Sequence, residues 1–302
     1  MPFIHPLPSD ARHPQVAAPP DVREQGHAEL LLRVLAVSGY GLWIWLGMGL
    51  AMGVERLGQG DLRMPLLLGG VLVSAGLLLV CVRLPASAAW HGWQPGRHRW
   101  PTGPAWMALL TFLPALLVVG LGDGHGHTPE MRLAGVTLML CSLVSLVYSV
   151  HHYRSQLSPG RQRISSSLPV SRLVTAWYAG GLWLWLCAMV QGGPELPDGS
   201  DLWILLLLAL ALLLGLLEAM RWQLLDARHV VRDPSEAPPL PPVRFVAAVL
   251  VYVLPCAALL LTERFGGGLL AAALAVPSCL LGKVLEQHVY ESALADDPGT
   301  ER

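Results

Sequence analysis

Residues able to do chemistry are sparse in this sequence, and their densest group is the loop stretch GDGHGHTPE. Asp123, His125, His127 and Glu130 lie close together there, and carboxylate and imidazole groups are common metal ligands. The glycines between them leave the loop without a fixed geometry, and no further ligand set is evident elsewhere. We interpret the stretch as an ordinary loop, with a metal site as the alternative, and expect no bound metal.

No motif of a known catalytic centre is present. The sequence has no nucleophile elbow, no His-Glu-x-x-His and no glycine-rich phosphate loop. No apolar run has a His near its middle, where a haem held between helices would need one. The five Cys residues include no Cys-x-x-Cys and are interpreted as small core residues. We therefore expect no catalytic residue, no haem and no iron–sulfur cluster in this chain.

Charged residues inside apolar segments often mark ion or proton pathways. Only Arg33, Glu218, Lys283 and Glu286 come close to such a position, and each lies near the end of its segment. This distribution speaks against a proton-coupled transporter.

The elements that position these residues are apolar helices. Only 14% of the 302 residues are charged, against roughly 25% in soluble proteins, and the mean hydropathy is +0.50. A helix needs about 20 apolar residues to cross a bilayer, and open sheet edges cannot lie in lipid. The sequence predicts an all-α polytopic membrane protein, a bundle of eight transmembrane helices. They are expected at 30–53, 64–83, 104–122, 132–151, 170–192, 202–220, 244–262 and 268–289.

The domain organisation follows from these segments. Residues 1–28 are expected to form a disordered N-terminal tail, 29–292 the eight-helix transmembrane domain, and 293–302 a disordered C-terminal tail. The first segment lacks the apolar core of a secretory signal peptide. The net charge of -1 and the absence of a basic run exclude nucleic acid as the expected partner and leave the lipid bilayer.

Basic residues are distributed unequally between the two sides of the expected bundle. Arg56, Arg63, Arg132 and Arg264 fall on one side, and all other Lys and Arg residues fall on the other. The positive-inside rule then places both termini and the three long loops in the cytoplasm, with the chain in a bacterial inner membrane.

On this charged side, four apolar segments continue into polar stretches, and we interpret this side as a docking surface for a partner protein. Lys283 and Glu286 are spaced i, i+3 and so share one helix face. An ordinary solvated helix end is the alternative interpretation of that stretch. The candidate docking residues are Tyr153, Arg154, Arg161, Arg163, Arg228, Lys283 and Glu286. On the same side, Trp90, Trp93 and Trp100 flank basic residues; they either belong to an interfacial aromatic belt or line a site for a flat ring.

Four stretches carry a family resemblance. They are CVRLPASAAWHGWQPGRHRWPTGPAW, VYSVHHYRSQLSPGRQR, VRFVAAVLVYVLPCAALLL and LLGKVLEQHVYESAL. Together they make the chain similar to a divergent member of the membrane anchor subunits of dimethyl sulfoxide reductase-type molybdoenzymes. The resemblance covers roughly residues 30–295.

The resemblance implies a non-catalytic anchor and quinol-interacting subunit of an oxidoreductase complex active in anaerobic respiration. Such a subunit passes electrons between the quinone pool, as transiently bound menaquinol or ubiquinol, and an iron–sulfur partner. The implied partners are a ferredoxin-like iron–sulfur subunit and a molybdopterin catalytic subunit, which hold the clusters and the molybdopterin.

The chain departs from the family at two positions. Cys81 stands where the family has its quinol-linked His, and Pro104 where it has Glu. Loop residues are the expected substitutes, among them His, whose ordinary pKa of about 6.5 suits proton transfer. The candidate quinol-binding residues are Arg83, Trp90, His91, Arg97, His98 and Trp100.

Two other functions stay open. Helices broken by Pro114 and Pro255 would suit a small-solute membrane transporter. The two departures favour a scaffold or assembly protein that has lost electron transfer. The family's topology also places the termini in the periplasm. We follow the charge distribution of this sequence, which places them in the cytoplasm.

Overall fold

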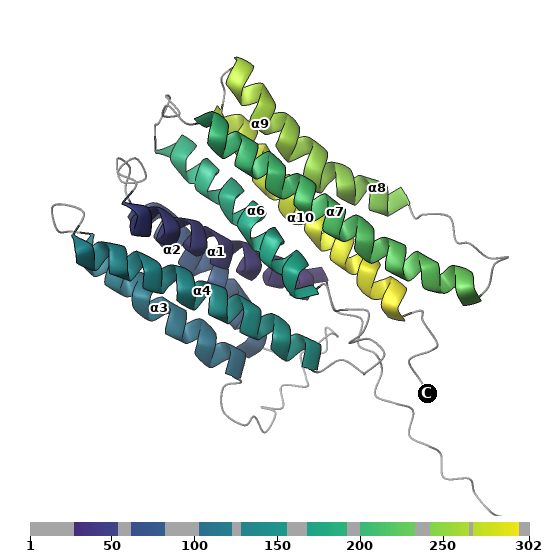
Figure 1. The fold of residues 1–302 in the computed structure, drawn as a ribbon, viewed down its shortest axis with the longest axis horizontal. Helices are drawn as coiled ribbons and strands as arrows, with labels where there is room; N and C mark the ends of the chain where they lie inside the picture. The colour runs from purple at the N-terminus through teal and green to yellow at the C-terminus, as the bar shows by residue number, and fades with distance from the viewer. Residues whose placement is uncertain are drawn as a thin grey trace, which may run out of the picture.

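The computed structural model describes residues 27–53, 62–81, 103–122, 128–155, 168–191, 200–232, 242–265 and 268–295. Every one of these segments is helical, and none of them contains a strand (Figure 1). The helices are α1 His27–Met52, α2 Arg63–Cys81, α3 Gly103–Leu121, α4 Pro129–Ser155, α6 Leu168–Val190, α7 Ser200–Arg232, α8 Pro242–Ala248, the π-helical turn η3 Val249–Val253, α9 Leu254–Phe265 and α10 Gly268–Ala295.

Six stretches of the described helices are long and apolar enough to cross a membrane. They are Glu29–Met52, Pro129–His152, Pro169–Val190, Leu202–Gln223, Pro242–Thr262 and Gly268–Tyr290. The apolar parts of α2 and α3 are shorter, at Arg63–Leu77 and Trp106–Leu121. Large apolar side chains such as Leu116, Leu212 and Leu270 are exposed on the outside of the bundle. An apolar exterior around apolar helices is the pattern of a membrane protein.

The helices form two groups that meet along α1 and α6. One group contains α1 to α4 and the other contains α6 to α10, as the colours of Figure 1 show. Each group buries its own core: one is built from α1, α2, α3 and α4, the other from α6, α7, α9 and α10 with the start of α1. α1 packs extensively against α2, α4 and α6, so it is the central helix of the bundle.

The contact between α1 and α6 depends on two glycines. A Cβ atom added to Gly41 would overlap the carbonyl group of Ala176, and one added to Gly180 would overlap the backbone of Gly41. Small residues allow such backbone contact between membrane helices, where packing rather than hydrophobic burial drives association. Beside this crossing, the indole nitrogen of Trp45 donates a hydrogen bond to the Trp177 carbonyl oxygen at 2.7 Å.

The two crossing helices carry the same short pattern. Residues 41–46 are Gly-Leu-Trp-Ile-Trp-Leu, and residues 181–186 are Gly-Leu-Trp-Leu-Trp-Leu. Each copy lies in the second half of the first helix of its group. From the second copy, Trp183 returns a hydrogen bond to the first helix, from its Nε1 to Ser38 Oγ at 3.3 Å. The two copies differ at one of the six residues, Ile44 against Leu184.

The segment expected as one helix at 244–262 is instead divided by a π-helical turn. Pro255 has no N–H to donate to the carbonyl of Val251, four residues earlier, and its ring would collide with that carbonyl in a regular helix. The chain responds with a wider turn, in which the Leu254 N–H bonds to the Val249 oxygen. The Tyr178 hydroxyl on α6 donates to the Val251 oxygen at 3.1 Å, which replaces the missing helical bond.

Replacing Tyr178 by phenylalanine removes this donor from the buried Val251 carbonyl. We expect a loss of about 1 kcal/mol of stability, since side-chain hydrogen bonds in membrane bundles are modest. Heat denaturation of the detergent-solubilised protein, followed by size-exclusion chromatography, measures the change. Tyr148→Phe is the matched control, because Tyr148 is exposed on α4; equal midpoints for the two variants would contradict the role of Tyr178.

The observed helix bounds correct the expected ones at several points. α1 begins at His27 and α10 ends at Ala295, just outside the expected limits of 29 and 292. α7 runs to Arg232, well past the expected end at 220, because Gly and Pro are absent from Leu216 to Arg232. The rest of the two expected tails lies outside the described residues.

Candidate functional site

The sequence-predicted quinol site lies outside the part of the chain that the structure describes. Arg83, Trp90, His91, Arg97, His98 and Trp100 all belong to the stretch between α2 and α3. Among the expected docking residues, Arg161 and Arg163 also lie outside. Tyr153, Arg154 and Arg228 belong to the α4 and α7 helices, but their side chains are not among those described.

Lys283 and Glu286, which the sequence predicts on a docking surface, lie inside the bundle in the structure. The Lys283 side chain is only 3% exposed and that of Glu286 only 12% exposed. Both turn into the bundle, toward α7, because a charge in apolar surroundings is stable only beside a partner of opposite charge. They form part of a buried ionic cluster, which contains Ser171, Glu218, Arg221, Lys283 and Glu286 and which we take as the candidate functional site.

Lys283 is the centre of the ionic cluster. Its Nζ donates to Glu218 Oε1 at 2.9 Å and to Glu286 Oε2 at 2.8 Å. The first bond joins α10 to α7, and the second lies within α10, between residues three apart. One ammonium group therefore serves two carboxylates.

Glu218 has further donors from two helices. Ser171 Oγ, at the start of α6, donates to Glu218 Oε1 at 3.0 Å, and Arg221 Nη1 donates to Glu218 Oε2 at 3.2 Å. Arg221 Nη1 also lies 3.4 Å from Ser171 Oγ. With two cationic and two anionic side chains the ionic cluster is balanced, which is the condition for keeping ion pairs inside a low-dielectric bundle. It joins α6, α7 and α10 at one level.

Aromatic rings surround the ionic cluster. The Arg221 guanidinium lies over the Tyr290 ring at 4.1 Å, and Lys283 Nζ lies 5.9 Å from the Tyr252 ring centre. Trp222 meets Tyr290 edge to face at 5.8 Å. Such cation–π contacts stabilise buried cations that have left water.

Several buried polar atoms beside the ionic cluster have no hydrogen-bond partner among the described residues. They are Arg221 Nε, Tyr252 OH, Gln287 Oε1 and Tyr290 OH. Nearly all buried polar groups in proteins are hydrogen-bonded, so this end of the bundle has a capacity for hydrogen bonds that the described side chains do not use. The free atoms include one donor, one acceptor and two hydroxyls that do both.

The neighbouring backbone allows this arrangement. Gly282 precedes Lys283 on α10, and a Cβ there would lie 2.6 Å from Val251 Cγ2 and 2.9 Å from the Ala247 oxygen. The absence of a side chain lets α10 approach α8 and the π-helical turn closely. Tyr252 belongs to that turn, and π-helical turns are frequent at functional sites.

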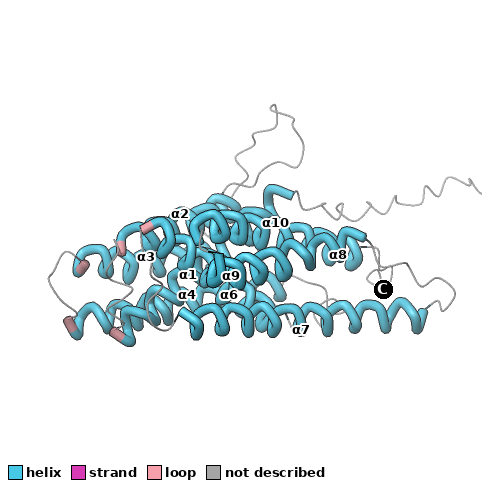
Figure 2. Tube along the Cα trace, turned by 90° about the horizontal axis from the view of Figure 1, so that it is seen from above, coloured by secondary structure: helices cyan, strands magenta, loops and turns pink. Residues whose placement is uncertain are grey.

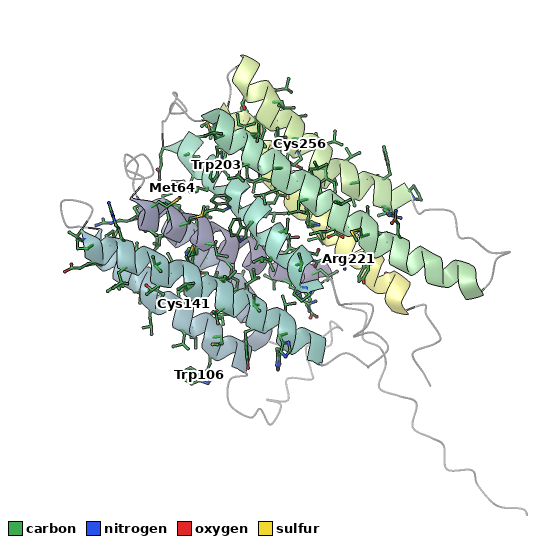
Figure 3. The ribbon with its side chains drawn as sticks, viewed as in Figure 1. Met64, Trp106, Cys141, Trp203, Arg221 and Cys256 are labelled. Carbon is green, nitrogen blue, oxygen red and sulfur yellow. The ribbon has the colours of Figure 1, made fainter. Side chains whose placement is uncertain are left out.

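The ionic cluster lies toward one end of the bundle. Figure 3 shows Trp203 near the start of α7 and Arg221 farther along it, before the part of the helix that runs on to Arg232. α6 and α8 begin at the Arg221 end, and α10 ends there, while α7 extends beyond all of them (Figures 1 and 2). This is the end to which the sequence assigns the long loops and most of the positive charge.

Within the described ranges, no group of three or more His, Cys, Asp and Glu side chains is arranged to hold a metal ion. Of the loop residues weighed as ligands, Glu130 is exposed at the start of α4. Asp123, His125 and His127 lie outside the described residues.

Comparison with models of protein families, with curated proteins and with solved structures finds no match to this chain.

The sequence singles out Glu218, Lys283 and Glu286 as charges near apolar segments, but it does not show that they contact one another or that Arg221 joins them. Glu218 with Arg221 and Lys283 with Glu286 are opposite charges spaced i, i+3 near the ends of two apolar runs. Two pairs of opposite charges at a similar distance from the ends of their apolar segments could have predicted that α7 and α10 contact each other there. Ser171, Tyr252, Gln287 and Tyr290 carry no such signal, because each is an ordinary residue in an apolar helix.

Proposed function

We propose that the chain is the membrane anchor and quinol-interacting subunit of a dimethyl sulfoxide reductase-type molybdopterin/iron–sulfur oxidoreductase. In this role it spans a bacterial inner membrane eight times with both termini in the cytoplasm. It passes electrons between menaquinol or ubiquinol and a ferredoxin-like iron–sulfur subunit, which supplies the molybdopterin subunit in anaerobic respiration. The anchor holds no metal of its own.

The observation that carries this proposal is the projecting, internally braced end of the second helix group. At about 1.5 Å per residue, the 33 residues of α7 are roughly 50 Å long, against a bilayer core of about 30 Å. The ionic cluster ties α7 to α6 and α10 just before α7 leaves the apolar zone. A helix end that is fixed in this way offers a rigid platform for a partner subunit.

Purification of the tagged protein from its native membranes in mild detergent tests the proposal. We expect a molybdopterin subunit and an iron–sulfur subunit to co-purify, with iron measurable by metal analysis. Arg228→Glu, on the projecting part of α7, should lower the iron recovered by at least about ten-fold, because a reversed charge at a docking surface costs several kcal/mol.

The matched control is Arg132→Glu, an exposed position on α4 at the other end of the bundle. It should leave the recovered iron unchanged. Recovery of the wild-type chain alone, without iron, would overturn the anchor function. Recovery of the full complex without quinol oxidation would indicate the scaffold function instead.

A small-solute transporter is the second candidate, because buried ionisable residues inside membrane helices commonly mark ion or proton pathways. Glu218 and Lys283 are such residues. Proton uptake into liposomes containing the purified chain alone distinguishes the two functions: the transporter moves protons without a partner subunit, and the anchor does not.

A further inference from the structure

The polar atoms around the ionic cluster exceed what its own ion pairs require. We propose that the cluster binds the head group of a quinol entering from the lipid, and that Glu286 accepts a proton from it. This inference rests on the proposed function and moves the quinol site from the loop after α2 to the second helix group.

The position of the ionic cluster selects a lipid-soluble ligand. Glu218 and Lys283 lie within the apolar spans Leu202–Gln223 and Gly268–Tyr290, near the end where α7 projects. A ligand that reaches this depth from the bilayer needs an apolar tail and a polar head. The site also lies on the side of the proposed iron–sulfur partner, which keeps the path for electrons short.

The groups that line the site select a planar ring with hydroxyl groups. The Tyr290 ring is covered by Arg221 and Trp222, and the Trp222 ring by Arg244. Tyr252, whose ring centre lies 5.9 Å from Lys283 Nζ, supplies the aromatic face against which a flat ring can pack. A hydroquinone hydroxyl both donates and accepts, so it can bond to the unpartnered Arg221 Nε–H and to the unpartnered Gln287 Oε1. A simple inorganic anion would leave Gln287 Oε1 without a donor.

The two carboxylates differ in how firmly they are held. Glu218 accepts hydrogen bonds from Ser171, Arg221 and Lys283, whereas Glu286 accepts one from Lys283 and lies against the Glu218 carboxyl group. The charged and titratable groups facing Glu286 are Lys283 and Glu218, with Arg221, Tyr252 and Cys279 around them and Tyr290 against Arg221. Glu218 is fixed as a counter-ion, and Glu286 is the carboxylate with free acceptor capacity.

The proposed reaction is the two-electron, two-proton oxidation of the quinol to the quinone. Both O–H bonds of the quinol break, both ring C–O bonds become C=O bonds, and the ring loses two electrons. The electrons pass one at a time to the iron–sulfur subunit of the complex. One proton forms an O–H bond with Glu286, and the other leaves to water at the polar end of the bundle.

Quinol oxidation by the purified complex in lipid nanodiscs tests this inference, with decylubiquinol as the probe. Glu286→Gln keeps the shape and hydrogen bonding of the side chain but cannot take up a proton. We expect kcat to fall by about 100-fold with KM changed less than about three-fold, the pattern for loss of a proton acceptor. Tyr290→Phe removes a hydroxyl without removing the acceptor, so it should raise KM by about five-fold and leave kcat nearly unchanged.

Glu130→Gln is the matched control, because it makes the same chemical change at an exposed position on α4. Rates are expressed per folded complex, as measured by size-exclusion chromatography, because Glu286→Gln removes one of the two carboxylates bonded to Lys283. Tyr252→Phe provides a second hydroxyl variant if Tyr290→Phe is unstable. If the wild-type complex oxidises quinol and Glu286→Gln behaves as Glu130→Gln does, the inference is wrong and the proposed function stands. If the wild-type complex neither binds nor oxidises decylubiquinol, the quinol function itself fails.

Discussion

Replacing Lys283 by methionine is expected to destabilise the protein by about 3–5 kcal/mol, the cost of removing one partner from a buried ion pair. The substitution keeps the length and apolar stem of the side chain, so packing changes little. It leaves the Glu218 and Glu286 carboxylates facing each other without the ammonium that bonds to both at 2.9 and 2.8 Å. Heat denaturation in detergent, followed by size-exclusion chromatography, should show a lower midpoint and aggregated material.

Two companion variants separate charge from packing. Lys283→Arg retains the positive charge and should lose much less stability than Lys283→Met. The double variant Lys283→Met with Glu286→Gln removes one of the opposed carboxylates and should recover part of the loss. A Lys283→Met protein as stable as the wild type would show that the ionic cluster does not hold α7 and α10 together.

Replacing Gly41 by leucine is the second large expected effect. The new side chain would have to occupy the space of the Ala176 carbonyl, so α1 and α6 must separate at their closest point. Overpacking of side chains typically costs about 1–3 kcal/mol, and a clash with backbone exceeds that range because backbone cannot rotate away. We expect little folded protein to be recovered from membranes.

Gly120→Leu is the control for this substitution. Gly120 lies on α3, and an added Cβ there meets no atom within 4 Å. The same residue change on the same kind of helix should therefore leave the yield and the denaturation midpoint unchanged. Similar losses for Gly41→Leu and Gly120→Leu would mean that the crossing of α1 and α6 tolerates larger residues.

The helices themselves could be predicted because apolar runs of sufficient length have few alternatives in a membrane. The expected segment 132–151 falls inside α4, and 170–192 nearly coincides with α6. The π-helical turn at Val249–Val253 is not predicted by the presence of Pro255 alone. Whether a proline bends, breaks or widens its helix depends on which group replaces the lost hydrogen bond, and here that group is Tyr178, from another helix.

The candidate site was harder to predict, because it is defined by contacts between residues of different helices and not by any one residue. Lys283 and Glu286 taken alone resemble the polar exit of a helix from the membrane. Only their approach to Glu218, which lies 65 residues before Lys283, turns them inward.

The arrangement of the ion pairs has a consequence for the synthesis of the protein. Glu218 and Arg221 pair within α7 at 3.2 Å, and Lys283 and Glu286 pair within α10. Each helix therefore carries its own neutralising partner when it enters the membrane, which lowers the cost of about 2.5–3.5 kcal/mol for inserting a single charge. The bond between Lys283 and Glu218 forms only after the last helix has been inserted. A chain that stops before α10 leaves Glu218 with its Ser171 and Arg221 hydrogen bonds only, so α7 and α6 are joined before α10 completes the cluster.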